Sequence, residues 1–320
     1  MTTETTTPTT TTRSALRLRG AFTALVTPFT RAGAVDEAAF VRLVERQIDL
    51  GIDGLVPCGT TGESPTTSHE EDDRLIGLVV ETVARRGMTG RIRVIAGTGS
   101  NNTATAVTST RRAAALGADA ALVVAPYYNK PDQRMLEAHY RTIADEGDLP
   151  LVVYNVPGRT ASNVEAGTLR RLAEHTRIVA VKEASANLEQ IMTILRDRPD
   201  GFSVLSGDDS WTYPLLALGG DGVISVASNE IPAEMARLCS LAFEGRWDEA
   251  RALHERLLEL MRANFISPNP VPVKAALAEM GLIEDVLRQP LLSMAEELRP
   301  RLRAALQAAG VELAPALVAA

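Results

Sequence analysis

A lysine ends an apolar run in the stretch RIVAVKEAS, where Lys182 follows four residues typical of a buried strand. The chain has 33 Lys and Arg residues, yet only Lys130, Lys182 and Lys274 are lysine, which also fits a coding bias toward arginine. A strand-end lysine can simply extend its ammonium group to water. A desolvated lysine instead has a lowered pKa and can attack a carbonyl to form a Schiff base, which permanently protonated arginine cannot do. Lys182 is therefore a candidate nucleophile.

Hydroxyl and guanidinium side chains follow other apolar runs of the chain. They are Thr60, Thr61, Tyr127, Tyr128, Tyr154 and Arg159. Tyrosines mostly pack in cores or interfaces, and a Gly-rich loop is usually an ordinary turn. Beside a Schiff-base lysine, however, such hydroxyls can pass the protons that imine formation and aldol addition require. The loop GTTGES could hold a carboxylate with its backbone N–H groups, and Arg159 could bind a second carboxylate bidentately.

Eight short apolar runs, each followed by a turn and a helical pattern, must position these residues. The runs are AFTALVT, DGLVPC, IRVIAG, ALVVAP, LPLVVYN, IVAVKE, FSVLSG and DGVISV. They are nearly continuous rather than alternating, as expected for parallel strands buried on both faces. Eight such strands with interleaved helices predict a (β/α)8 TIM barrel, an α/β fold whose active site lies at the C-terminal ends of the strands. A doubly wound open sheet is the alternative, but GTGSNN at residues 97–102 lacks the third glycine of the dinucleotide fingerprint.

The first barrel helix is predicted to begin after Asp36, which can cap it, and to end near Gly51. The residues expected on its buried face are Phe40, Leu43, Val44 and Ile48.

The β pattern stops before residue 245, which divides the chain into three expected parts. Residues 1–17 are expected to be a disordered Thr-rich tail, because MTTETTTPTTTT has no apolar core. Residues 18–244 are expected to form the barrel, and residues 245–320 a C-terminal helical appendage. Its helices are predicted from Trp247 to Asn264, from Val273 and from Met294.

Composition excludes several classes of function. A net charge of −7 provides no basic surface for nucleic acid or anionic membranes, and no apolar run is long enough to span a bilayer. Two cysteines are too few for a disulfide framework, so we expect a soluble protein in the reducing cytoplasm. The four histidines are scattered without ligand spacing, so no metal is expected.

Seven motifs together resemble the dihydrodipicolinate synthase / N-acetylneuraminate lyase family of class I aldolases. In order along the chain, they are GTTGES, PYYNKP, YNVPGRT, VKEAS, SGDD, GGDGVISV and NPVPVK. The resemblance covers roughly residues 18–310. It implies an imine between pyruvate and Lys182 and a proton relay of Thr61, Tyr154 and Tyr128, with Tyr128 reaching in from a neighbouring subunit of a homotetramer. No cofactor is implied.

The resemblance also assigns substrate contacts. The backbone at Thr60 and Thr61 would hold the pyruvate carboxylate, and the carbonyl of Ile224 would line the site. Arg159 matches the arginine with which the synthases of the family bind L-aspartate 4-semialdehyde. At Ala186 this chain departs from the family, where glycine commonly follows KEAS.

A regulatory site for lysine is the last implication of the resemblance. Lysine-inhibited members use residues matched here by Ser64, His69, Asn101 and Tyr127. Where they carry a glutamate four residues after the asparagine, this chain has Thr105, and where a second histidine is common it has Asp72. Inhibition by lysine is therefore expected to be weak.

Two alternatives to the synthase activity remain open at this point. One is another pyruvate-dependent aldolase or dehydratase of the family that acts on a sugar acid, against which Arg159 argues. The other is a non-catalytic barrel that binds a small carboxylate, a function that does not need Lys182.

Overall fold

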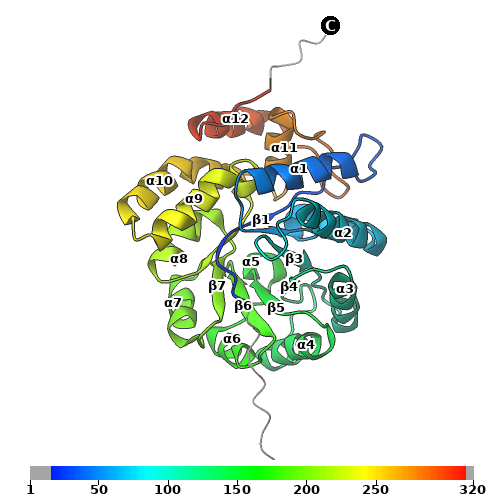
Figure 1. The fold of residues 1–320 in the computed structure, drawn as a ribbon, viewed down its shortest axis with the longest axis vertical. Helices are drawn as coiled ribbons and strands as arrows, with labels where there is room; N and C mark the ends of the chain where they lie inside the picture. The colour runs from blue at the N-terminus through cyan, green and yellow to red at the C-terminus, as the bar shows by residue number, and fades with distance from the viewer. Residues whose placement is uncertain (1–15, 315–320) are drawn as a thin grey trace, which may run out of the picture.

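A closed barrel of eight parallel strands forms the centre of the chain in the computed structural model, which describes residues 16–314 (Figure 1). The strands are β1 (Gly20–Ala24), β2 (Gly54–Val56), β3 (Arg93–Gly97), β4 (Ala120–Val124), β5 (Leu151–Asn155), β6 (Ile178–Glu183), β7 (Ser203–Ser206) and β8 (Gly222–Ser225). Each predicted apolar run overlaps one of them, and β1 and β4 begin one residue before their runs. The barrel closes because β1 pairs with both β2 and β8, so that Phe22 lies opposite Gly54 on one side and Ile224 on the other. The predicted TIM barrel is confirmed.

Helices surround the strands. Those of the barrel are α1 (Glu37–Asp49), α2 (His69–Arg85), α3 (Thr103–Ala115), α4 (Gln133–Glu146), α5 (Pro157–Thr160), α6 (Ala166–Ala173), α7 (Leu188–Asp197), α8 (Thr212–Ala217) and α9 (Pro232–Phe243). Helix α1 begins as predicted, since the Asp36 carboxylate accepts a hydrogen bond from the Ala39 amide at 2.9 Å. It ends two residues before Gly51, and its four predicted apolar residues are buried.

Two apolar cores follow from this arrangement. The inner core fills the barrel, with Phe22, Ile95, Val152, Leu205 and Ile224 among its members. Gly54 makes room for this core, because a Cβ there would lie 2.2 Å from a ring carbon of Phe22. The outer core lies between the strands and the ring of helices. The strands are thus buried on both faces, which explains their unbroken apolar runs.

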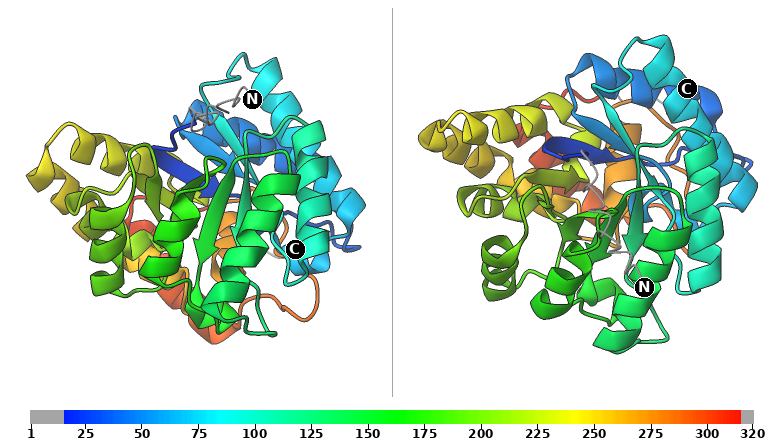
Figure 2. Two further views of the ribbon diagram at one scale, coloured as in Figure 1. Left: turned by 90° about the horizontal axis from the view of Figure 1, so that it is seen from below. Right: turned by 60° about the horizontal axis from the view of Figure 1, so that its bottom comes forward.

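The C-terminal region consists of α10 (Trp247–Ala263), α11 (Val271–Glu279) and α12 (Arg299–Ala308). Leu302 and Leu306 of α12 belong to the same core as the barrel helices, so the region packs against the barrel. In Figure 2, α11 and α12, in orange and red, lie behind the barrel strands, and α12 packs against α10 and α11. The last helix begins at Arg299, later than the predicted Met294, because residues 281–295 form turns and extended segments.

The predicted disordered tail lies almost entirely outside the described residues, which begin at Leu16. Within residues 16–314, no helix is both long and apolar enough to cross a membrane.

Candidate active site

Lys182 lies inside the C-terminal mouth of the barrel, on β6, and is only 5% exposed. Burial lowers its pKa to about 8, against the opposing effect of the nearby Asp209 carboxylate, and the positive charge of Arg159 lowers it further. Its Nζ lies 4.3 Å from the centroid of the Tyr154 ring on the neighbouring strand β5. Gly207 packs against it so closely that a Cβ would lie 3.1 Å from Cγ of the lysine. The amine is therefore confined and partly deprotonated near neutral pH.

The other two lysines differ from Lys182. Lys130 is exposed to solvent. Lys274 is completely buried, but its Nζ forms an ion pair with Glu63 at 2.5 Å. Lys182 forms no ion pair with any residue in the range 16–314. Among the three, it alone combines burial with an unpaired amine, which is what a nucleophilic lysine requires.

Tyr154 contacts Thr60 rather than Thr61. Burial raises the pKa of the Tyr154 phenol, while the charge of Arg159 and a hydrogen bond with the Thr60 side chain oppose this shift. The Thr61 hydroxyl instead accepts a hydrogen bond from Nδ2 of Asn269 at 3.0 Å. The resemblance assigned the relay threonine to Thr61, but in this structure the Thr61 hydroxyl is bound by Asn269 and the Thr60 side chain contacts Tyr154. The threonine whose hydroxyl can exchange a proton with Tyr154 is Thr60.

The GTTGES loop leaves two backbone donors free. Its first turn is the short 3-10 helix Thr60–Gly62, in which the amides of Gly62 and Glu63 donate to the carbonyls of Gly59 and Thr60. The amides of Thr60 and Thr61 donate to no group within residues 16–314. Two adjacent free N–H groups form a site for an anion such as a carboxylate.

Arg159 and Ile224 lie at two further strand ends. Arg159 follows β5 on the short helix α5, is exposed, and forms no ion pair within the described part of the chain. Ile224 lies on β8, where its side chain is fully buried in the inner core. Arg159 therefore follows the C-terminal end of β5, and Ile224 is the residue before the last one of β8.

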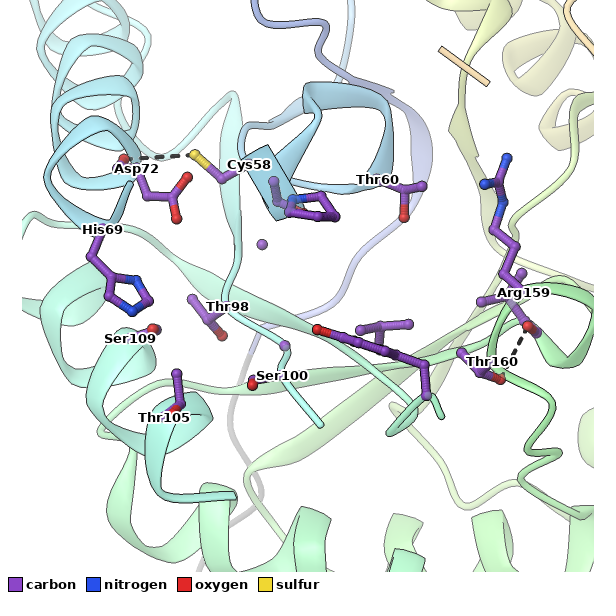
Figure 3. A pocket seen from close by; sticks show the side chains of 17 residues that line it. Cys58, Thr60, His69, Asp72, Thr98, Ser100, Thr105, Ser109, Arg159 and Thr160 are labelled. Carbon is purple, nitrogen blue, oxygen red and sulfur yellow. Dashed lines mark hydrogen bonds between the residues drawn. The ribbon is translucent and has the colours of Figure 1, made fainter. Parts of the chain in front are cut away.

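A cavity of about 300 Å³ opens beside this site and is lined by Thr60 and Arg159 on one side (Figure 3). The cavity is also lined by Ser64, His69 and Tyr127 of the predicted regulatory set, together with Asp72 and Thr105. Asn101 lies next to the cavity, since its Nδ2 donates a hydrogen bond to the Tyr127 carbonyl at 3.2 Å. The structure therefore brings the four predicted regulatory residues together.

Asp72 and Thr105 place a carboxylate and a hydroxyl in the wall of the cavity. Burial raises the pKa of the Asp72 carboxyl, and the Thr67 hydroxyl donates to it at 2.7 Å. Figure 3 shows Thr105 on α3, facing the cavity that His69 and Asp72 border. An ammonium ligand would meet one carboxylate here, on α2, and a hydroxyl on α3.

Tyr128 is not part of the site within one chain. It is 90% exposed and has a φ of 74°, a left-handed conformation that non-glycine residues seldom adopt. The neighbouring Tyr127 is 40% exposed and lines the cavity. A fully exposed tyrosine in a strained conformation is suited to contact another molecule.

Asp209 is a site residue that the sequence analysis missed, although the motif SGDD contains it. It is fully buried, and its Oδ2 accepts hydrogen bonds from the amides of Val226 and Ala227 at 3.0 and 2.9 Å. Burial raises its pKa to about 6. Asp209 therefore links the end of β8 to the surroundings of Lys182. Residues 16–314 contain no cluster of three or more potential metal ligands.

Comparisons with known proteins agree with this geometry. A model of the dihydrodipicolinate synthetase family matches residues 17–309. A 4-hydroxy-tetrahydrodipicolinate synthase of Koribacter versatilis (strain Ellin345) is 52% identical over 297 residues, which make up 92% of this chain and 97% of that protein.

Two solved structures are similar over nearly their whole length. A dihydrodipicolinate synthase from Cyanidioschyzon merolae with lysine bound is 43% identical, with a TM-score of 0.88, and the match covers 91% of this chain and 98% of that one. The chloride-inhibited enzyme from Acinetobacter baumannii complexed with pyruvate is 41% identical, with a TM-score of 0.88, over 92% and 99% of the two chains. This chain belongs to the dihydrodipicolinate synthetase family.

Proposed function

We propose that the chain is a 4-hydroxy-tetrahydrodipicolinate synthase, a lyase of the class I aldolase type that condenses pyruvate with L-aspartate 4-semialdehyde. The observation that carries the proposal is the buried, unpaired amine of Lys182, whose pKa is lowered to about 8. Relatives about 50% identical over most of the chain bear this enzyme's name. The reaction belongs to lysine and diaminopimelate biosynthesis, which we place in the cytoplasm.

The first half of the reaction activates pyruvate. The neutral amine of Lys182 attacks the keto carbon, and loss of water from the carbinolamine gives an iminium ion. The amides of Thr60 and Thr61 hold the pyruvate carboxylate, and the Ile224 carbonyl borders the bound substrate. Tyr154 and Thr60 carry protons to the departing hydroxyl and from the methyl group, which turns the iminium ion into an enamine.

The second half forms the new bonds. The enamine carbon attacks the aldehyde carbon of the semialdehyde, whose oxygen takes up a proton. The amine of the semialdehyde then attacks the iminium carbon, closes the ring and displaces Lys182, so that no redox step or cofactor is needed. Arg159, which has no carboxylate partner within the described residues, binds the carboxylate of the semialdehyde. A sugar acid with a single carboxylate, held at the pyruvate site, would leave this guanidinium without that partner.

A homotetramer built as a dimer of dimers is also part of the proposal. The exposed Tyr128 would complete the proton relay of the adjoining subunit. Two exposed apolar side chains on α7 offer a further contact between subunits. They are Leu188 and Met192, which lie one turn apart and are 41% and 42% exposed. Tyr128→Phe should slow turnover, and dilution to monomers should do the same if the tyrosine crosses the interface. Sedimentation velocity alongside activity, measured across a dilution series, would separate these effects.

Borohydride reduction in the presence of pyruvate tests the reaction directly. A pyruvyl adduct should form on the peptide containing Lys182 and on neither Lys130 nor Lys274, as read by mass spectrometry after digestion. Lys182→Ala should abolish trapping while leaving the far-UV circular dichroism spectrum unchanged. An unmodified Lys182 peptide from active, pyruvate-saturated protein would refute the imine mechanism.

A further inference from the structure

Three residues of the C-terminal region form hydrogen bonds with the GTTGES loop. Nδ2 of Asn269 donates to the Thr61 hydroxyl, and Nζ of Lys274 on α11 pairs with the Glu63 carboxylate. The backbone amide of Arg288 donates to the same carboxylate at 3.1 Å. These partners are more than 200 residues apart in sequence, so the contacts form only when the C-terminal region packs on the barrel.

The Glu63–Lys274 pair is fully buried, with neither side chain exposed. Nζ of the lysine also donates to the Thr27 carbonyl at 2.9 Å and lies 4.3 Å from the centroid of the Phe29 ring. Breaking a buried ion pair by removing one partner is strongly destabilising, whereas replacing both partners by neutral groups often is not. Such a pair is therefore better suited to fixing one geometry than to adding stability.

The ion pair fixes an unfavourable backbone conformation at Glu63. Glu63 has a φ of 56°, in the left-handed region that costs a non-glycine residue free energy. It directly follows the short helix that contains Thr60 and Thr61, whose free amides face no other acceptor in the described chain. Because Asn269 holds the Thr61 hydroxyl, Thr61 offers the site its amide rather than its side chain.

We propose that Asn269 and Lys274 are positioning residues for pyruvate, which act by holding the amides of Thr60 and Thr61 in the carboxylate-binding conformation. This inference rests on the proposed function, because it concerns the same pyruvate site. It assigns to the motif NPVPVK, and to the second buried lysine of the chain, a role in substrate binding rather than in chemistry. Neither residue contacts the reacting carbon in this proposal.

Asn269→Ala is the sharper variant, because it removes one neutral hydrogen bond and no charge. It should raise the pyruvate concentration that gives half-maximal borohydride trapping by about two- to tenfold, the usual effect of one such bond. The KM for the semialdehyde should stay unchanged. Asn264→Ala is the matched control, since Asn264 is also buried in the C-terminal region and donates one hydrogen bond, at 2.8 Å, to Glu230 away from the loop.

A double replacement tests the ion pair while avoiding an unpaired buried charge. Lys274→Met combined with Glu63→Gln should give a folded protein, as judged by thermal unfolding. Its half-maximal pyruvate concentration should rise at least as much as that of Asn269→Ala. Retention of the wild-type concentration dependence in both variants would overturn the proposal.

The controls separate a positioning role from general destabilisation. If Asn264→Ala shifts the pyruvate dependence as much as Asn269→Ala does, the effect is structural and the proposal is wrong. Failure of the proposed function looks different, because the unmodified protein would then form no adduct on Lys182 at any pyruvate concentration.

Discussion

The side chain of Lys182 should lose its proton near pH 8 rather than near 10.5, because burial disfavours its charged form. At pH 7, about one amine in ten would then be neutral, against about three in ten thousand for an ordinary lysine, an increase of about 300-fold. The amine is protonated below its pKa and becomes nucleophilic as the pH rises through that value. The rate of imine trapping should therefore increase with pH, reach half of its maximum near pH 8 and level off about one unit above that.

Three lysines make this titration directly measurable. Protein labelled with ¹³C at Cε of lysine should give three resonances, from Lys130, Lys182 and Lys274. Lys182→Arg should remove the one that titrates with a midpoint near pH 8. A Lys182 resonance that still reports a charged amine at about pH 10 would refute the reasoning, because the amine could not then act as a nucleophile at neutral pH.

Asp209 supplies a second test of the same reasoning. Its buried carboxylate is the strongest of the nearby groups that favour the charged amine, so Asp209→Asn should move the Lys182 midpoint to lower pH. Asp208→Asn is the matched control, because Asp208 acts in the same direction but more weakly. A larger shift from the Asp208 variant would contradict the assignment of the two carboxylates.

Five other variants have defined outcomes. Arg159→Ala should weaken use of the semialdehyde by about ten- to a hundredfold, the usual value of a charged hydrogen bond, while pyruvate trapping survives in the borohydride assay. Thr60→Val should lower kcat by about a hundredfold or more, because it removes a relay hydroxyl, whereas Thr61→Val should mainly affect pyruvate saturation. Millimolar lysine should inhibit the unmodified enzyme weakly in a steady-state assay, and Thr105→Glu should increase sensitivity by adding a carboxylate to the cavity. Ala186→Gly should raise the free energy of unfolding by about 1 kcal/mol in urea denaturation, because Ala186 has a φ of 55°.

The barrel could be predicted because each of its strands is specified by a short, local pattern in the sequence. Each strand is buried on both faces, so it appears in the sequence as a short, unbroken apolar run followed by a turn. The cap at Asp36 is likewise a short-range signal, since the carboxylate binds an amide three residues later. The position of Lys182 at the end of such a run then followed from the fold, because active sites of these barrels lie at the C-terminal strand ends.

The orientation of individual side chains could not be predicted in the same way. Thr60 and Thr61 are adjacent and chemically identical, and what separates their roles is Asn269, 208 residues beyond Thr61. Asp209 was overlooked because its acceptor role depends on the amides that follow β8. Tyr128 is exposed in a single chain, because its expected partner is another subunit.

The pairing of β1 with β8 has a consequence for synthesis of the chain on the ribosome. Strand β1 emerges first, but its second edge has no partner until β8 appears roughly 200 residues later, or about 10–40 s at ordinary elongation rates. During that interval an unpaired apolar edge is open to aggregation. Because Asn269, Lys274 and Arg288 come later still, the nascent polypeptide would reach its full affinity for pyruvate only in the last tenth or so of translation. A chain that ends before these residues should therefore be degraded by cellular quality control rather than act as a weakened enzyme.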